Sequence, residues 1–299
     1  MNREVVNFLS SHGDVKTDAK FKDITTIRMG GDIRYLVSPY DMNRLTLIIK
    51  YLKEQDIPYK IVGRGSNMIC GSAPYEGCVI HLEHLNRYHF DDDGELYIEA
   101  GVMAPRIANV MASQGLSALE FASGIPGTIG GLLYMNAGAY KKSMSDIVTK
   151  VLVLMDDELV WLENKNLGFA YRTSIFQKHP EWTIVACKIK VEKGEPETIK
   201  ALIADRLKRR KATQPLDKPS AGSCFRNPQN DFSWRLIDAS GFRGYRYNGI
   251  EVSNKHPNFV LNVDDGTAED FIMTTNLIKL KVMDNFGVDL IMEVELFNC

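Results

Sequence analysis

The chain has 299 residues and a balanced charge, with 36 Lys+Arg against 38 Asp+Glu and a net charge of −2. A chain of this length buries about three quarters of its unfolded surface, so we expect it to fold without disulfide or metal staples. The balanced charge argues against the global basic field that nucleic-acid or anionic-membrane partners require.

Five cysteines are scattered along the chain, and no two form a C-x-x-C pair. An odd, scattered set favours reduced thiols over a disulfide framework and predicts a cytoplasmic location. The stretch MNREVVNFLSSHGD interrupts its apolar residues with charge too early for a signal peptide. Residues 121–140 carry no charge, but their glycines and proline favour a ligand loop with a buried flank over a membrane span.

Helical and strand patterns follow one another in irregular order. The predicted helices are 42–55 with Asp41 as N-cap, 105–115, a charged helix within 195–219 that stops at a proline-containing loop, and 267–284. The predicted strands are 59–67, which runs into a glycine turn, then 77–82, 95–101, 147–156, 158–162, 182–191 and 288–297. This order predicts an α+β fold rather than regular βαβ winding.

Several familiar site motifs are missing from the sequence. There is no Walker G-x-x-x-x-G-K-[ST], no H-E-x-x-H and no G-x-S-x-G, and the one G-x-G lacks the third glycine of a dinucleotide fingerprint. His81, His84 and His89 lie close together in the sequence, but their spacing on a strand and turn does not bring them to one face. We therefore expect no metal site.

Two glycine-rich loops are the main functional signal. GRGSN (63–67) follows a predicted strand, and SGIPGTIGG (123–131) is followed by NAGAY (136–140). Glycines allow positive φ and a close approach of a ligand to bare backbone, and successive backbone N–H groups can form an anion-binding nest. Four glycines and a proline in nine residues make poor core material. The two loops therefore predict a ligand that carries a diphosphate with an extended group attached.

The order of these loops resembles the flavin-binding domain of the UDP-N-acetylenolpyruvoylglucosamine reductase (UDP-N-acetylmuramate dehydrogenase) family, which has the vanillyl-alcohol-oxidase-like (PCMH-type) FAD fold. The resemblance spans nearly the whole chain and continues, in the family's order, through TTIRMGG (25–31), YRTSIF (171–176), AGSCFRNP (221–228), WRLIDASG (234–241), VSNKHPNFVLN (252–262) and EVELF (293–297). The direct path from YRTSIF to the strand at 182 resembles the family's shorter subtype.

The resemblance implies an α+β protein with a two-part FAD-binding module and a C-terminal α+β substrate domain. We expect the N-terminal part of the module over 1–55, the FAD-binding domain over 56–192 and the substrate domain over 193–299. The last strand is expected to pack back on the N-terminal part.

The implied activity is a two-step reduction. NADPH reduces FAD, and reduced FAD then reduces the enolpyruvyl ether of UDP-N-acetylenolpyruvoylglucosamine to the lactyl ether of UDP-N-acetylmuramate, a peptidoglycan precursor. This activity belongs to cell-wall biogenesis and thereby to cell shape, the cell cycle and cell division. The first loop contains no His or Cys, so the resemblance implies noncovalent FAD.

The resemblance also implies which residues contact the cofactor. They are Gly63, Arg64, Gly65, Ser66, Asn67, Ser123, Gly124, Pro126, Gly127, Thr128, Gly130, Gly131, Asn136, Ala137 and Gly138.

Three side chains match the family's catalytic positions. Hydride addition builds negative charge beside the substrate carboxylate, and Arg172 is the matching cation, because a guanidinium binds a carboxylate through two parallel bonds. Ser223 matches the proton donor to the resulting carbanion. Glu293 matches the family's acidic residue, which helps a developing enolate if it is protonated or if it orients a donor.

Ser223 is followed by Cys224, a second reactive side chain. In an extended segment neighbouring side chains point to opposite faces, so only one of the two can meet the flavin. We expect Phe225 to share the face of Ser223 and Cys224 to pack as a small apolar residue.

Lys211, Asn227 and His256 are weaker candidates for substrate contacts, and positive charge near 206–211 suits a diphosphate. We expect small-molecule partners only, a UDP-sugar and NADPH, with no nucleic acid and no membrane, and a monomer. Two alternatives stay open. One is an FAD-linked oxidase or dehydrogenase of the same fold that acts on another alcohol or sugar, and the other is a non-catalytic nucleotide-binding protein.

Overall fold

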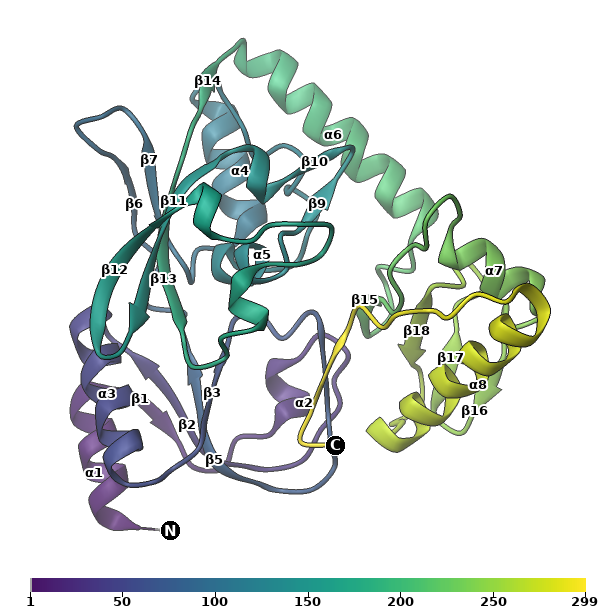
Figure 1. The fold of residues 1–299 in the computed structure, drawn as a ribbon, viewed down its shortest axis with the longest axis horizontal. Coiled ribbons are helices and arrows are strands. Elements are labelled where there is room, and N and C mark those ends of the chain that lie inside the picture. The colour runs from purple at the N-terminus through teal and green to yellow at the C-terminus, as the bar shows by residue number, and fades with distance from the viewer. Residues whose placement is uncertain (1) are drawn as a thin grey trace. The chain divides into compact units, whose positions relative to one another are not determined.

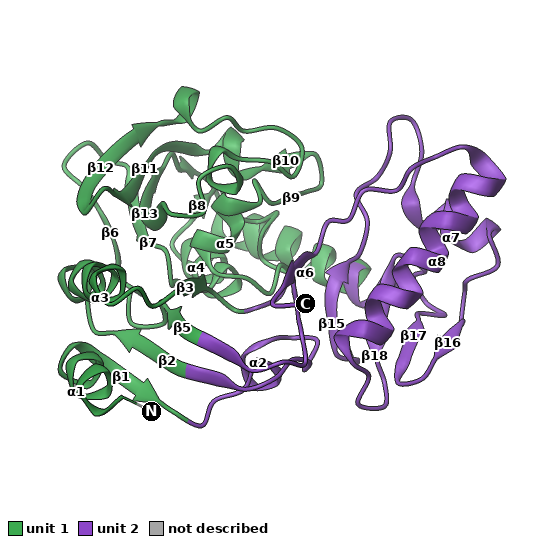
Figure 2. Cartoon of the chain, turned by 60° about the horizontal axis from the view of Figure 1, so that its bottom comes forward, with its two compact units in different colours: residues 1–17, 35–64, 77–209 green, residues 18–34, 65–76, 210–299 purple. Residues whose placement is uncertain are grey.

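The computed structural model describes residues 2–299 (Figure 1) and groups them by their contacts into two compact units. Unit 1 comprises the chain up to Thr17, then Tyr35–Arg64 and Gly77–Arg209, and unit 2 comprises Asp18–Arg34, Gly65–Glu76 and Arg210–Cys299 (Figure 2). The chain passes between the units several times, and the crossings include points within β2 (Ile33–Pro39), within β5 (Tyr75–His81) and near the end of α6 (Pro196–Thr213).

This grouping differs from the three consecutive segments expected from the sequence. Two short pieces from the first quarter of the chain belong to unit 2 with the C-terminal segment. The physical reason is strand pairing: β4 (Met68–Cys70) pairs in parallel with β19 (Glu295–Phe297). The ring of Phe297 also packs edge-on against Phe21, so the last strand contacts the N-terminal quarter of the chain.

Unit 1 contains two larger sheets besides two-stranded pairings. The first has the order β1-β2-β5-β3 and adds β1 (Gly13–Lys16) and β3 (Tyr59–Val62) to the two strands named above. The second has the order β12-β11-β13-β7-β6, and its strands are β6 (Tyr88–Phe90), β7 (Leu96–Glu99), β11 (Val148–Met155), β12 (Glu158–Glu163) and β13 (Thr183–Ile189). Every pairing in the second sheet is antiparallel, so it is built from hairpins and returns rather than from βαβ crossovers.

Helices α1 (Arg3–His12) and α3 (Met42–Glu54) lie side by side in unit 1 (Figure 1). The side chain of Asp41 accepts a hydrogen bond from the Arg44 N–H at 2.9 Å, which confirms the predicted N-cap of α3. The buried residues of α3 recur at helical spacing and are Leu45, Ile48, Ile49 and Leu52. They join the main core of unit 1, which continues through both sheets.

Helix α4 (Ala104–Ser113) begins with Pro105 in its first turn and is followed by Gly115 at φ +69°, as the sequence predicts. Helix α6 buries only Ile199 and Ile203, which pack with Ala112 of α4. The remaining positions of α6 are mostly exposed, so this helix lies on the surface of unit 1.

The main sheet of unit 2 has four antiparallel strands and packs against helices. The sheet has the order β15-β18-β17-β16, and its strands are β15 (Ser220–Ser223), β16 (Arg246–Tyr247), β17 (Ile250–Val252) and β18 (Phe259–Asn262). Helices α7 (Ser233–Ala239) and α8 (Ala268–Phe286) pack together beside it (Figure 2). Thr267 and Asp270 form a capping box that starts α8, and Gly287 at φ +67° ends it.

The predicted final strand over 288–297 is shorter than expected, because only Glu295–Phe297 pairs with another strand. The apolar run before it contributes buried Leu290 and Val294 to the core of unit 2, which is separate from that of unit 1. Among the described helices, none combines the length and the apolar character needed to cross a membrane.

Candidate active site

The first glycine loop presses against the second within unit 1. A Cβ at Gly63 would lie 2.4 Å from Oγ1 of Thr128, far inside contact distance. Thr128 is the N-cap of helix α5 (Ile129–Tyr134), and its hydroxyl accepts a hydrogen bond from the Gly131 N–H. Glycine at 63 is therefore required for the two loops to meet, as expected for loops that hold one ligand.

From Gly65 onward the first loop belongs to unit 2. Gly65 has φ +60°, and a Cβ there would lie 2.5 Å from the carbonyl oxygen of Ile24. Asn67 donates its side-chain N–H to the carbonyl of Glu293 at 3.0 Å and accepts at its own carbonyl from the Glu295 N–H at 2.8 Å. The loop thus reaches the backbone of a candidate catalytic residue. Arg64 is exposed and Ser66 half-buried.

The second loop is hydrogen-bonded to the segment before α4. The Gly130 N–H donates to Ala100 at 2.8 Å, and the Ala104 N–H donates to Gly127 at 3.0 Å. Ser123 is buried and its hydroxyl donates to the Glu120 carbonyl, so its side chain stabilises the backbone just before the loop. Around it, Gly124 is half-buried, Pro126 exposed and Gly127 buried.

The prediction of a loop over 121–140 is wrong in one respect, because α5 begins inside it at Ile129. Burial of Ile129, Leu132 and Leu133 and the Thr128 cap outweigh the helix-weakening effect of Gly130 and Gly131. The two glycines differ in their surroundings. A Cβ at Gly130 would lie 3.0 Å from the Ala100 Cβ, whereas Gly131 is exposed and its Cβ would meet nothing closer than 3.7 Å.

The NAGAY segment forms a tight hairpin after α5. Strands β9 (Gly138–Ala139) and β10 (Lys142–Ser143) are joined by Tyr140 and Lys141, both at positive φ, as a type I′ turn requires. The Tyr140 hydroxyl donates to the Arg206 carbonyl at 3.1 Å, and the Arg206 guanidinium lies 4.7 Å from the Tyr140 ring centre. The hairpin tip is thereby fixed to α6.

Asn136, at φ +40° and buried, uses its side-chain amide inside the protein. Its N–H group donates to the Ala170 carbonyl at 2.9 Å, and its oxygen accepts from the Ser145 N–H at 3.0 Å. The neighbouring Ala137 N–H donates to the Leu132 carbonyl, which closes the end of α5. This segment therefore links α5 to the YRTSIF stretch.

Arg172 sits at the tip of a two-residue turn in that stretch. Ala170 and Thr173 exchange backbone hydrogen bonds across it at 3.0 and 3.1 Å, and Arg172 has φ +53°. Its Nη2 donates to the Gly138 carbonyl at 2.9 Å, so the candidate catalytic cation contacts the candidate cofactor segment. A left-handed conformation at a non-glycine residue is often found at functional sites.

Ser223 ends β15 in unit 2 and is half-buried. The next residue, Cys224, is 1% exposed and packs in the apolar core, as predicted; burial raises the pKa of its thiol to about 12. The prediction that Phe225 shares the face of Ser223 is wrong, because Phe225 is buried in the same core as Cys224. Strand β15 ends at Ser223 and the chain bends at Cys224, so the alternation of an extended strand does not continue to Phe225.

Asn258 holds this segment in place and was not singled out from the sequence. Its side chain donates to the Phe225 carbonyl at 2.8 Å and accepts from the Phe225 N–H at 3.0 Å, and its own carbonyl accepts from the Cys224 N–H. Its position in the VSNKHPNFVLN motif is the signal that could have identified it. In unit 1, Ser174 and Gln177 were missed in the same way, and both anchor the stretch that carries Arg172.

Glu293 is half-buried, and its backbone N–H donates to the Cys224 carbonyl at 2.7 Å. Unit 2 therefore brings Asn67, Ser223 and Glu293 into one hydrogen-bonded neighbourhood. Unit 1 likewise brings together Gly63, Thr128, the 136–138 segment and Arg172. The three catalytic candidates are thus divided between two units.

The three weaker candidates all lie in unit 2. Lys211 is exposed and its carbonyl accepts from the Lys255 ammonium at 2.6 Å; Asn227 is exposed and its side-chain oxygen accepts from the Ser233 N–H at 3.1 Å. His256 is half-buried, and burial lowers the pKa of its imidazole.

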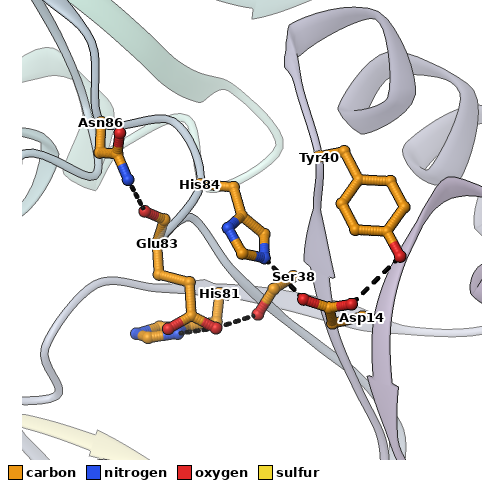
Figure 3. A network of polar contacts seen from close by, with 7 residues as sticks. All are labelled: Asp14, Ser38, Tyr40, His81, Glu83, His84 and Asn86. Carbon is orange, nitrogen blue, oxygen red and sulfur yellow. Dashed lines mark hydrogen bonds and ion pairs between the residues drawn. The ribbon is translucent and has the colours of Figure 1, made fainter.

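Two histidines of HLEHLNRYH, His81 and His84, belong to a polar network at the surface of unit 1 (Figure 3). His84 Nε2 lies 2.8 Å from Asp14, and this hydrogen bond lowers the pKa of the Asp14 carboxyl. His81 lies 3.7 Å from Glu83, and the ring of His89 instead lies 4.7 Å from that of Tyr97, centre to centre. Within residues 2–299, no three His, Cys, Asp or Glu side chains are arranged to hold a metal ion.

The chain also matches known families and proteins. Residues 214–297 match the family described as UDP-N-acetylenolpyruvoylglucosamine reductase, C-terminal domain, and residues 33–162 match the family described as FAD binding domain. The UDP-N-acetylenolpyruvoylglucosamine reductase of Anoxybacillus flavithermus is 37% identical over 286 residues, 95% of this chain and 94% of that protein. The chain belongs to the UDP-N-acetylenolpyruvoylglucosamine reductase family.

Other members of this reductase family agree with that assignment. UDP-N-acetylenolpyruvoylglucosamine reductase 2 of Bacillus cereus is 37% identical over 298 residues, which is 98% of this chain and 97% of that protein. The crystal structure of the UDP-N-acetylenolpyruvylglucosamine reductase of Thermus caldophilus superposes with a TM-score of 0.80 at 28% identity, covering 95% of this chain and 99% of that one.

The flavoprotein fold extends beyond the reductase family. Berberine bridge enzyme from Eschscholzia californica has a TM-score of 0.50 at 13% identity, covering 64% of this chain and 44% of that one, which shows the fold alone. The predicted α+β, PCMH-type fold with a C-terminal reductase domain is therefore confirmed.

Proposed function

We propose that this chain catalyses the NADPH-dependent reduction, through bound FAD, of UDP-N-acetylenolpyruvoylglucosamine to UDP-N-acetylmuramate. The observation that carries the proposal is the match of residues 214–297 to the C-terminal domain of the reductase family. FAD binding domains occur in oxidases as well, so the first half of the chain does not choose the substrate. The C-terminal domain carries Ser223 and Glu293 and separates this reading from an oxidase of the same fold.

The residues of the two loops fit FAD held without a covalent bond. Gly131 is exposed, and the protein itself leaves room for an alanine side chain there, so packing does not require a glycine. Gly63, in contrast, is needed for the backbones of the two loops to meet. Bare backbone of this kind suits the flat ring system and diphosphate of FAD. When bound, FAD supplies hydride transfer between NADPH and the enolpyruvyl double bond.

The proposed reaction uses three side chains, each with its own role: Arg172, Ser223 and Glu293. The Arg172 guanidinium binds the enolpyruvyl carboxylate and stabilises the negative charge that grows beside it. The Ser223 hydroxyl gives its proton to the carbon that carries this charge. Glu293, whose backbone is bonded to the Ser223–Cys224 segment, orients or supplies the donor at the same centre.

Further substrate contacts would come from unit 2. Lys211, Asn227 and His256 are the proposed contacts, and all three lie in unit 2 together with Ser223. Among them, the positive charge of Lys211 suits the diphosphate. We further propose that the protein works as a monomer in the cytoplasm on small molecules, without nucleic-acid or membrane partners.

Two measurements test the proposal. The purified protein should carry flavin absorbance, and NADPH oxidation should rise sharply when the enolpyruvyl UDP-sugar is added. The product should carry a lactyl ether with one new carbon-bound hydrogen from the flavin and one from solvent. Rapid oxygen consumption that does not respond to the UDP-sugar would instead identify an oxidase of the same fold.

A further inference from the structure

The turn that carries Arg172 has an unfavourable backbone conformation. Its second central residue has positive φ, a position that favours glycine or asparagine, and here it is arginine at φ +53°. Such a conformation persists only where the surrounding structure holds it in place. The side chains that hold this turn are therefore part of how the guanidinium is presented.

Gln177 is bonded directly to the strained residue. Its Nε2 donates to the Arg172 carbonyl at 3.1 Å and also to the Tyr134 carbonyl at 3.1 Å. An amide NH₂ has two N–H donors, and these two carbonyls are its shortest contacts, since the Met135 sulfur lies farther away at 3.6 Å. A single side chain thus joins the Arg172 turn to the end of α5.

Neighbouring contacts bring the turn to the same place. The Ser174 hydroxyl donates to the Tyr134 carbonyl at 2.6 Å, and Asn136 donates to the Ala170 carbonyl at 2.9 Å. Among these contacts, that of Gln177 is made to the backbone of Arg172 itself. Residues 134–138 therefore hold the turn in place through hydrogen bonds.

We propose that Gln177 is a positioning residue for the reduction: its amide holds the turn so that the Arg172 guanidinium faces the substrate carboxylate. This inference rests on the proposed function, because it assigns to Arg172 the role of binding that carboxylate. It adds that presentation of the cation depends on the side chain five positions further along the chain, which is bonded to the backbone of Arg172.

The primary test is a binding measurement on the flavin-loaded enzyme. UDP-N-acetylmuramate carries the carboxylate, and UDP-N-acetylglucosamine is the matching nucleotide sugar without it. Gln177→Met keeps the size of the side chain and removes both donors. We expect it to weaken binding of UDP-N-acetylmuramate about tenfold, the effect of roughly two ordinary hydrogen bonds, and to leave UDP-N-acetylglucosamine binding unchanged. Equal loss for both ligands would overturn the inference.

A double-mutant cycle separates positioning from general stability. If Gln177 acts through Arg172, then Gln177→Met should slow the sugar half-reaction about tenfold in the wild-type background and have no further effect in the Arg172→Ala background. The same loss in both backgrounds would assign Gln177 to the fold alone. Flavin reduction by NADPH should be unaffected in every variant.

Controls keep the outcomes distinct. Lys178→Met alters the exposed neighbouring residue and should leave both ligand affinities and both half-reactions as in the wild type. If Gln177→Met does not fold, Gln177→Asn, which keeps the amide but is one methylene shorter, takes its place; failure of both to fold would overturn the inference. Absence of turnover in the wild-type enzyme would contradict the proposed function itself, whereas the outcomes above contradict only the role of Gln177.

Discussion

The backbone N–H of Glu293 donates to the carbonyl of Cys224 at 2.7 Å, directly beside Ser223. A second contact, the antiparallel bridge between Phe225 and Met292, continues the pairing by one residue on each side. Two candidate catalytic residues that are far apart in the sequence are therefore adjacent through main-chain bonds, which do not depend on the rotamer of either side chain. This arrangement makes their roles testable one at a time.

Ser223→Ala should separate the two half-reactions. Removing the hydroxyl takes away the proton donor to the carbanion, and general acid catalysis typically contributes about 10²–10⁴-fold. We expect reduction of FAD by NADPH to proceed at the wild-type rate and transfer to the enolpyruvyl UDP-sugar to slow by that factor. Stopped-flow absorbance of the flavin measures both steps, and equal slowing of the two would show that Ser223 is not the donor.

Cys224→Ala is the matched control at the adjacent position. The thiol is buried, and burial raises its pKa to about 12, so it has almost no thiolate at neutral pH. Both half-reactions should stay at the wild-type rate, while loss of the packed sulfur lowers the free energy of unfolding by about 1 kcal/mol. A large loss of turnover in a folded Cys224→Ala protein would reopen the choice between the two side chains.

Gly131→Ala tests whether the second loop faces the cofactor. Alanine fits sterically at this exposed helical position, and replacing a helical glycine typically gains roughly 0.5–1 kcal/mol. We expect the apoprotein to become more stable and FAD to bind more weakly, because the new methyl group occupies the surface offered to the ligand. Thermal unfolding of the apoprotein and FAD titration measure the two effects.

Gly130→Ala provides the contrast one residue earlier. A Cβ there would lie 3.0 Å from the Ala100 Cβ, so we expect this change to destabilise the apoprotein. If Gly131→Ala stabilised the apoprotein and left FAD affinity unchanged, the cofactor would not lie against this part of the loop.

Much of the fold could be predicted because local signals and burial agree. The Asp41 cap, the apolar spacing of α3 and the first turn of α4 with Pro105 are each encoded within a few residues. Helix α5 could not be predicted, because its stability comes from burying Ile129, Leu132 and Leu133, which outweighs its two glycines. The low helix propensity of glycine predicts a loop at this place instead.

The candidate site divides in a similar way. Side chains such as Arg172 and Ser223 are candidates because of their motifs, since the proposed chemistry requires those residue types. The residues that hold these side chains in place could not be predicted in this way. Gln177 and Asn258 act through hydrogen bonds to backbone groups, and these contacts form only in the folded chain. The prediction for Phe225 failed because it assumed an extended segment, whereas β15 ends at Ser223 and the chain bends at Cys224.

His256 should make the protein less stable in mild acid. Burial lowers the pKa of its imidazole, the Arg243 charge lowers it further, and Nδ1 is buried with no hydrogen-bond partner among the residues described. The folded-state pKa is thus below the unfolded value of about 6.5, so the unfolded chain takes up the proton first as the pH falls. This contribution to stability is complete above about pH 6.5 and is lost as the pH falls through the folded pKa.

Urea unfolding at pH 7.5 and at more acidic pH measures this effect. The wild-type protein should lose more unfolding free energy on acidification than His256→Gln does. His89→Gln, which changes an exposed histidine of unit 1, should behave like the wild type. A His256→Gln protein with the full wild-type pH dependence would show that other groups account for it.

Alkylation of the native protein should label Cys299 before Cys78, Cys187 and Cys224. Burial raises the pKa of the last three thiols to about 12, whereas Cys299 is exposed to reagent, although its own pKa is raised as well. Only the thiolate reacts, so access and ionisation both favour the C-terminal residue. Iodoacetamide treatment near pH 8 followed by peptide mass spectrometry measures the order, and addition of denaturant should expose the buried thiols together. Early labelling of Cys224 in the folded protein would mean that the segment after Ser223 opens to solvent, in conflict with its place in the core of unit 2.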